Sequence, residues 1–93
     1  MRPSRNQSLI SALGVEVKAR RLELALSQED VAGRCDLDRP FITMIEGGRK
    51  QPTISVLYRL AAALDLSLGE FCQRVETRYL TEIEAAAGHP CGR

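Results

Sequence analysis

The fold is decided by residues 24–52, which read LALSQEDVAGRCDLDRPFITMIEGGRKQP. Within this stretch we predict two short helices, at 28–35 and 39–47, with a turn of about three residues between them. Ser27 and Asp38 stand where N-caps of these helices are expected, since their side-chain oxygens can accept from the first free backbone N–H groups. The stretch therefore predicts a corner of two helices packed across a tight turn.

Longer helices are predicted on both sides of this corner. A helical apolar pattern starts at Ser8, which we take as its N-cap, and stops near Leu26. Thr53 is the expected cap of a fourth helix that runs to about Asp65. The segment Ser67-Leu68-Gly69-Glu70 has the form of a capping box and opens a fifth helix. Five helices without strand-like alternation indicate an all-α domain.

The composition supports one small helical domain. The chain has 93 residues, of which 44% are hydrophobic and 4% aromatic, so aliphatic side chains must build the core. With 13 Lys+Arg against 12 Asp+Glu the net charge is +1, which argues against a polybasic tail but not against a local basic face. We divide the chain into a flexible arm at 1–7, a helix-turn-helix domain at 8–75, an extension of the fifth helix at 76–87 and a flexible tail at 88–93.

The residues that carry redox, metal or catalytic chemistry form no pattern. Cys35, Cys72 and Cys91 are widely spaced, so we expect neither a disulfide framework nor a zinc site. Cys35 and Cys72 are expected in the core. His89 lies in the tail, away from any nucleophile or ligand set. We therefore expect no enzyme activity, no metal, no cofactor, no small-molecule ligand, no membrane segment and a reducing, cytoplasmic location.

The third helix sorts its residues onto two faces. Leu37, Ile42 and Ile45 are predicted to point inward. The opposite face is basic or short-chained and lacks acidic residues, and it consists of Arg39, Pro40, Thr43, Met44 and Gly47. Such a face can lie against the major groove of DNA, and the two short helices together have the form of a helix-turn-helix unit.

At this point the chain resembles the Xre/Cro/C1-type helix-turn-helix family of phage repressors and bacterial regulators. The resemblance covers about residues 13–71 and is carried by 24–32, by 37–52 and by the leucine-rich pattern of 57–71. The Leu-Asp-Arg-x-Phe-Ile-Thr run at 37–43 is particularly similar to controller proteins of restriction–modification systems. The resemblance implies a compact five-helix, lambda-repressor-like DNA-binding domain.

The resemblance also implies roles for individual residues. It implies DNA base contacts by Arg39, Pro40, Thr43 and Met44 on a recognition helix at about 39–47. It implies backbone contacts by Gln28, Arg49 and Lys50, and the free N–H groups of helix starts at Ser27-Gln28 and Thr53 suit phosphate oxygens. Arg21 and Glu46 match a structural ion pair. Ala25 and Asp36 depart from the family because glycine or asparagine is usual at the first position and glycine at the second.

A stripe on the fifth helix bears on assembly. It consists of Phe71, Val75, Tyr79 and Ile83, with Arg74, Glu76, Arg78 and Glu82 off it. The stripe is either core or the seam of a symmetric homodimer, and we favour the seam. The sequence thus predicts a sequence-specific transcriptional regulator that binds an inverted-repeat operator in double-stranded DNA as a homodimer. The alternative is an antitoxin-like or partner-binding module on the same fold.

Overall fold

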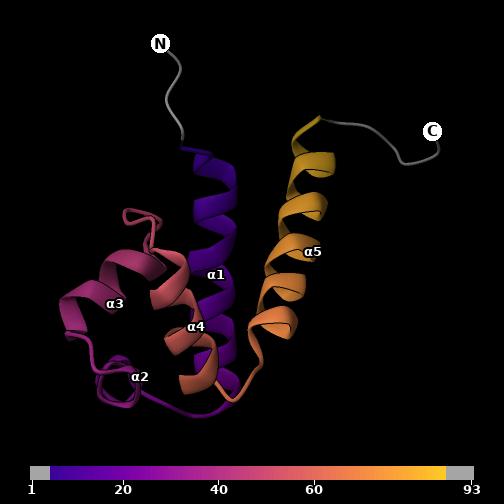
Figure 1. Ribbon diagram of the computed structural model, residues 1–93. Coiled ribbons are helices and arrows are strands. Elements are labelled where there is room, and N and C mark those ends of the chain that lie inside the picture. The colour runs from indigo at the N-terminus through magenta and orange to yellow at the C-terminus, as the bar shows by residue number, and fades with distance from the viewer. Residues whose placement is uncertain (1–4, 88–93) are drawn as a thin grey trace.

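Helix α1 (Gln7–Glu23) is the central element of the structure, a computed structural model that describes residues 5–87. It packs against α3 (Arg39–Glu46) on one side and against α5 (Leu68–Ala87) on the other (Figure 1). Helix α2 (Gln28–Cys35) contacts α3 and α4 (Ile54–Ala63), and α4 also contacts α5. These five helices, with no strand among the described residues, confirm the predicted all-α fold.

The core forms where the apolar sides of all five helices meet around α1. Its largest fully buried side chains come from every helix and are Val17, Val31, Ile42, Ile45, Leu60, Leu64 and Phe71. The inward positions predicted for the third helix, Ile42 and Ile45, are both fully buried. The recognition-helix candidate is therefore held by aliphatic packing on one side, which leaves its other side facing solvent.

Three helices begin at the capping side chains that local sequence rules predict, whereas Asp38, the expected cap of α3, stands at its N-cap position but makes no side-chain capping bond. Ser27 and Thr53 accept from the third backbone N–H of α2 and α4, at 3.0 and 3.2 Å. Ser67 and Glu70 form the expected capping box on α5. Helix α1 corrects the prediction, because Asn6 rather than Ser8 caps it and its side chain accepts from the Leu9 N–H at 3.1 Å.

Four helices end in the same way, with one residue in the left-handed conformation. These residues are Ala25 (φ 58°), Asp36 (φ 61°), Gly48 (φ 73°) and Asp65 (φ 60°). After each of them the next N–H donates back to a carbonyl five residues earlier, as in Leu26 to Arg21 at 3.0 Å. Three of the four positions lack the glycine that relieves this conformation, so the departures noted at Ala25 and Asp36 are positions of backbone strain.

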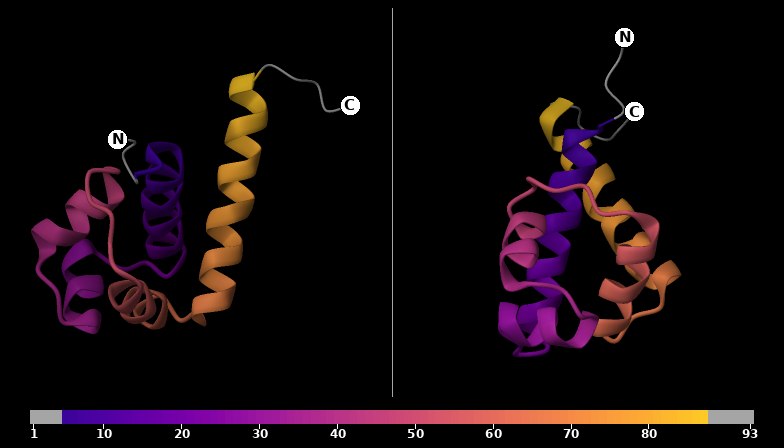
Figure 2. Two further views of the ribbon diagram at one scale, coloured as in Figure 1. Left: turned by 45° about the horizontal axis from the view of Figure 1, so that its top comes forward. Right: turned by 60° about the vertical axis from the view of Figure 1, so that its left-hand side comes forward.

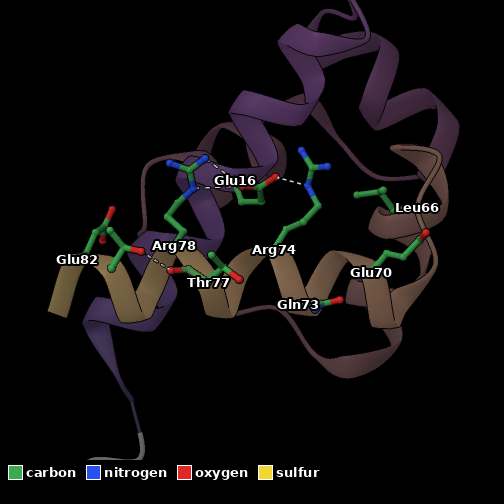
Figure 3. A pocket seen from close by; sticks show the side chains of 9 residues that line it. Glu16, Leu66, Glu70, Gln73, Arg74, Thr77, Arg78 and Glu82 are labelled. Carbon is green, nitrogen blue, oxygen red and sulfur yellow. Dashed lines mark hydrogen bonds and ion pairs between the residues drawn. The ribbon is translucent and has the colours of Figure 1, made fainter. Parts of the chain in front are cut away.

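Helix α5 is fastened to α1 by a buried carboxylate that the sequence did not reveal. Glu16 of α1 is 3% exposed and accepts from Arg74 Nε at 2.7 Å and Arg78 Nη2 at 3.0 Å. Figure 3 shows the two arginines reaching from α5 toward opposite sides of Glu16. The pairing, with Glu23 as a second partner, raises the pKa of Arg74. Arg74 and Arg78 lie off the apolar stripe, and the sequence analysis gave them no partner on α1.

The C-terminal end of α5 projects beyond the rest of the domain. It rises past the start of α1 in both views of Figure 2. Leu80 and Ile83 on this end are 53% and 40% exposed.

No helix among residues 5–87 combines the length and apolar character that crossing a membrane requires.

Candidate nucleic-acid interface

The candidate interface is the solvent-facing side of α2 and α3. These two helices pack against each other, and α3 lies on the opposite side of α1 from α5 (Figures 1 and 2). The turn between them is closed by Asp36 in the left-handed conformation and by the Leu37 N–H, which donates to the Ala32 carbonyl at 2.9 Å. The helix-turn-helix corner predicted from the sequence is therefore formed.

The outward face of α3 contains most of the predicted base-contacting residues. Arg39, Pro40 and Thr43 are exposed, whereas Met44 is half-buried. Pro40 falls in the first turn of the helix, where a missing N–H breaks no helical bond. Three of the four residues are thus available to a ligand that approaches this face, and Met44 presents part of its side chain.

The predicted ion pair between α1 and α3 is present. Arg21 Nε and Nη2 donate to the two oxygens of Glu46 at 2.7 and 3.0 Å, and the side chains are 10% and 6% exposed. A bidentate guanidinium–carboxylate pair of this kind fixes both groups in one plane. The hydrogen bond to Glu46 raises the pKa of Arg21. Arg21 also donates to the Leu26 carbonyl at 3.0 Å, so it connects the end of α1 to the segment before α2 as well as to the end of α3.

Gln28 continues this network to the outer face. Its Nε2 donates to Glu46 Oε1 at 3.0 Å, and its Oε1 accepts from the Thr43 hydroxyl at 2.8 Å. Gln28 was predicted to contact the DNA backbone and Thr43 to contact a base, and the structure brings the two side chains together. A base-facing residue is thereby connected through Gln28 and Glu46 to the buried Arg21.

The start of α2 is partly occupied by its own side chains. Ser27 accepts from the Asp30 N–H, and its own N–H donates to the Asp30 carboxylate at 2.9 Å. This hydrogen bond is the larger cause, and one donated by the Ser27 hydroxyl the smaller, of the lowered pKa of Asp30. The backbone N–H of Ser27 is therefore already used, and its hydroxyl can donate to a phosphate only by giving up the hydrogen bond to Asp30.

The start of α4 is better suited to an anion. Its first turn contains no acidic residue, and Arg49 and Lys50 precede it on an exposed loop. Lys50 Nζ lies 5.6 Å from the centroid of the Phe41 ring, which positions the ammonium group beside α3. Gln7 holds the loop in place by donating to the Gly48 carbonyl at 2.7 Å.

The predicted dimer seam is only partly on the surface. Phe71 and Val75 are 0% and 7% exposed because they pack into the core beside α1, so the structure corrects their assignment to an intermolecular seam. Tyr79 is half-buried and accepts from Asn6 Nδ2 at 2.9 Å. Ile83 is 40% exposed and remains available.

The cysteines and the other chemistry-bearing residues are placed as follows. Cys35 is buried, as expected, and burial raises the pKa of its thiol. Cys72 is exposed, so the expectation that it lies in the core was wrong. Cys91 and His89 fall outside the described residues. Among residues 5–87 no three His, Cys, Asp or Glu side chains form a group that could hold a metal ion.

Sequence reasoning missed two arginines that act on backbone groups. Arg20 Nε donates to the Leu64 carbonyl and Arg34 Nη1 to the Ala63 carbonyl, both at 2.9 Å. Both satisfy free carbonyls at the end of α4 and so connect it to α1 and α2. A basic residue near a helix end is the usual signal for such a contact, but here the residues lie on other helices and no local pattern could show them.

Comparison with known proteins agrees with this geometry. A family model described as helix-turn-helix matches residues 17–71, more than half of the chain. The control protein C.MunI of Mycoplasma sp is 34% identical over 59 residues, which are 63% of this chain and 80% of that protein. The uncharacterized HTH-type transcriptional regulator y4dJ of Sinorhizobium fredii (strain NBRC 101917 / NGR234) is 40% identical over 47 residues. Those residues are 50% of this chain and span 61% of that relative.

A solved structure extends the comparison to three dimensions. The restriction-modification controller protein C.Esp1396I, crystallised as a tetramer in complex with its natural 35 base-pair operator, aligns with a TM-score of 0.72 and 32% identity. The alignment covers 77% of this chain and 95% of that one. On the family match, the relatives and the corner formed by α2 and α3, the chain belongs to the Cro/C1-type helix-turn-helix family.

Proposed function

We propose that this protein is a sequence-specific DNA-binding transcriptional regulator that inserts α3 into the major groove. The observation that carries the proposal is the exposed face of Arg39, Pro40 and Thr43, with the acid-free start of α4 and its basic loop beside it. The controller protein C.Esp1396I, which aligns over most of its length, is described in complex with its operator. A regulator of this kind acts where the chromosome is, so we place it in the cytoplasm, in a binding rather than a catalytic role.

The exposed residues divide into base readers and backbone contacts. Arg39 has the two parallel donors that match guanine O6 and N7, and Pro40 and Met44 offer apolar contact to a thymine methyl. Arg49, Lys50 and the free N–H groups at Thr53 are suited to phosphate oxygens, which carry no sequence information. Gln28 and the Ser27 hydroxyl would complete the backbone contacts on the other side of α3.

A direct test is binding-site selection from random duplexes, followed by affinity measurements at increasing salt. Binding should weaken steeply with salt because basic residues displace condensed counterions, and a flat response would contradict the proposal. Lys50→Ala should weaken binding to all sequences about equally. Arg39→Ala should also relax one base-pair preference per half-site, with a loss of about 1–3 kcal/mol at that position.

We further propose that the protein binds an inverted-repeat operator as a homodimer. A single recognition helix reads only a few base pairs, whereas two helices related by a two-fold axis reach successive major grooves about 34 Å apart. The candidate contact surface is a largely apolar groove of about 550 Å³ between α1, α4 and α5, lined among others by Leu9, Leu57, Cys72 and Tyr79. Next to Leu57 on α4, Ile54 and Tyr58 are 64% and 63% exposed.

The occupant of this groove is, in our proposal, a second copy of the chain. The exposed apolar side chains on α4 and at the end of α5 would enlarge the contact beyond the groove in such a self-complementary pair. Because Phe71 and Val75 are buried, the proposed contact lies beside the predicted stripe and not on it. Of the four stripe residues, Ile83 stays in the proposed contact, and Tyr79 contributes its half-buried ring.

Oligomeric state is the test of this surface. Leu9→Glu should give a folded monomer with much reduced operator affinity, because Leu9 lines the groove and is 38% exposed, so the substitution places a charge in an apolar contact. Leu22→Glu is the matched control, since Leu22 is 59% exposed on α1 and does not line the groove, and it should leave the dimer intact. Sedimentation that shows a wild-type monomer at micromolar concentration, or a Leu9→Glu dimer, would overturn the groove as the interface.

A further inference from the structure

We propose that Thr43 contacts the operator as a hydrogen-bond acceptor and therefore selects adenine or cytosine on the strand that it faces. These two bases present an amino group in the major groove, whereas guanine and thymine present acceptor oxygens there. The proposal rests on the DNA-binding function proposed above and adds the chemistry by which one residue reads sequence. It is carried by the chain of hydrogen bonds from Arg21 to Thr43.

The first step is the orientation of the Gln28 amide. Glu46 is held by Arg21 and can only accept, so the group of Gln28 that lies 3.0 Å from Glu46 Oε1 must be the Nε2 donor. The reverse orientation would place two acceptor oxygens against each other without a hydrogen between them. The negative charge of Glu46 therefore fixes the orientation of the Gln28 amide, and its carbonyl oxygen faces Thr43.

The second step is the position of the Thr43 hydroxyl hydrogen. Thr43 Oγ1 lies 2.8 Å from Gln28 Oε1 and 3.2 Å from the Arg39 carbonyl oxygen, and both of these are acceptors. A hydroxyl has one hydrogen and two lone pairs, so its hydrogen points to one of these two oxygens. What Thr43 offers outward is then a lone pair, with no hydrogen left to donate.

The third step is what a lone pair can recognise. Thr43 is exposed on the same face of α3 as Arg39 and Pro40, where the proposed function places base edges. An acceptor there can accept a hydrogen bond from adenine N6 or cytosine N4. Guanine O6 and thymine O4 are themselves acceptors, so they would face it without a hydrogen bond. A freely rotating threonine would tolerate all four bases, so the discrimination comes from the internal bonds to Gln28 and Arg39.

Two variants of Thr43 separate the hydroxyl from the methyl group. Binding-site selection with wild type and Thr43→Val identifies the base position that Thr43 reads, because the preference there should disappear when the hydroxyl is replaced by a methyl group. Thr43→Ser keeps the hydroxyl and should keep the preference. The wild-type preference at this position should be adenine or cytosine on one strand.

Base analogues then test the donor directly. Replacing that adenine by purine, or that cytosine by 2-pyrimidinone, deletes the amino group and leaves the rest of the major-groove edge in place. We expect wild type to lose affinity about five-fold per half-site, the worth of one ordinary hydrogen bond, and Thr43→Val to show no further loss. The wild type should be measured on both duplexes at the same salt concentration.

The outcomes distinguish this inference from the proposed function. If wild type selects no sequence at all, the proposed function fails. If it selects an operator but the Thr43 position prefers guanine or thymine, or no position relaxes in Thr43→Val, the inference fails alone. A thymine preference that Thr43→Val keeps and Thr43→Ser loses would show that the methyl group is the reader and would equally overturn it.

Discussion

At the scale of single residues, Glu46 accepts hydrogen bonds from two partners with different roles, Arg21 and Gln28. It accepts two hydrogen bonds from Arg21, which joins α1 to α3, and one from Gln28, which lies at the start of α2. Because both side chains of the ion pair are nearly buried, removing one leaves the other without water to replace its partner.

Glu46→Ala is therefore expected to lower the free energy of unfolding by about 3–5 kcal/mol. Glu23→Ala is the matched control, because Glu23 also bonds arginines but its side chain is 50% exposed, and there the loss should stay below about 1 kcal/mol. Urea unfolding followed by circular dichroism measures both. Equal effects of the two substitutions would contradict the buried character of the Arg21 pair.

Backbone strain at Ala25 gives a substitution that should stabilise the protein. Its φ of 58° disfavours any side chain, and glycine relieves this while adding some freedom to the unfolded chain. Ala25→Gly is expected to raise the free energy of unfolding by about 0.5–1 kcal/mol. Ala62→Gly, in the last turn of α4, should lower it because glycine disfavours a helix, and a shift of the same sign in both would argue against strain at Ala25.

At the scale of helices, the position of α3 depends on how closely α1 approaches its end. A Cβ atom on Gly14 of α1 would lie against the carbonyl oxygen of Ile45 and 2.7 Å from that of Glu46. Backbone oxygens cannot rotate away, so the helices could accommodate a methyl group only by moving apart. Gly14 is thus the contact that sets the spacing between the central helix and the recognition helix.

Gly14→Ala should destabilise the protein by about 1–3 kcal/mol through this overpacking and should weaken operator binding as α3 shifts. Gly33→Ala provides the control within the same chain, because a Cβ atom there meets nothing within 4 Å on the exposed side of α2. It should stabilise the protein by about 0.5–1 kcal/mol, since alanine favours a helix over glycine. Thermal unfolding of the two variants measures this. If Gly14→Ala, like Gly33→Ala, melted at a higher temperature than wild type, the close contact at Gly14 would be contradicted.

The elements also show what sequence can predict and what it cannot. The caps at Ser27, Thr53 and Ser67 follow from rules that span three residues, and all were predicted. The pairing of Glu16 with Arg74 was not, because it joins residues 58 positions apart and depends on how α5 packs. Periodicity likewise showed that Phe71 belongs to an apolar stripe but not which surface the stripe covers.

The candidate site divides along the same line. The residues of the outer face, such as Arg39, could be predicted because they follow from the register of one helix and from the family pattern. The bond between Gln28 and Thr43 could not, since it requires the angle between α2 and α3. The partial burial of Met44 has the same origin, because tertiary packing, not helical register, decides how far an outward side chain extends.

At the scale of the whole molecule, the stability of the protein in acid depends on carboxylates in three helices, α1, α2 and α5. Hydrogen bonds from the backbone N–H of Ser67 and of Ser27 lower the pKa of Glu70 and Asp30 below their ordinary values of 4.5 and 3.8. The hydrogen bond from Arg20 lowers the pKa of Glu23 in the same way. A lowered pKa in the folded state stabilises the protein above the ordinary value, and this stabilisation is lost as the pH falls through the lowered one.

The melting temperature should therefore fall as the pH is lowered through and below these values. Glu70→Gln keeps an oxygen that can accept from the Ser67 N–H but cannot titrate, so the fall between neutral pH and about pH 3 should be smaller in this variant. Glu84→Gln is the control, because Glu84 is exposed near the end of α5, and this variant should follow the wild-type curve. Parallel curves for Glu70→Gln and wild type would contradict a role for the capping box in acid stability.

The bonds that connect Thr43 through Gln28 to Glu46 have a consequence for how such a regulator can diverge. The side chains of Arg39 and Pro40 lie on the outer face and take no part in these bonds, so mutations there can change the recognised DNA while leaving the scaffold intact. Mutations at Thr43 or Gln28 disturb a group that also fastens α1 to α3. We expect gene duplicates of this protein to acquire new operators first through Arg39 and Pro40, and to retain the pairing of glutamine with threonine longest.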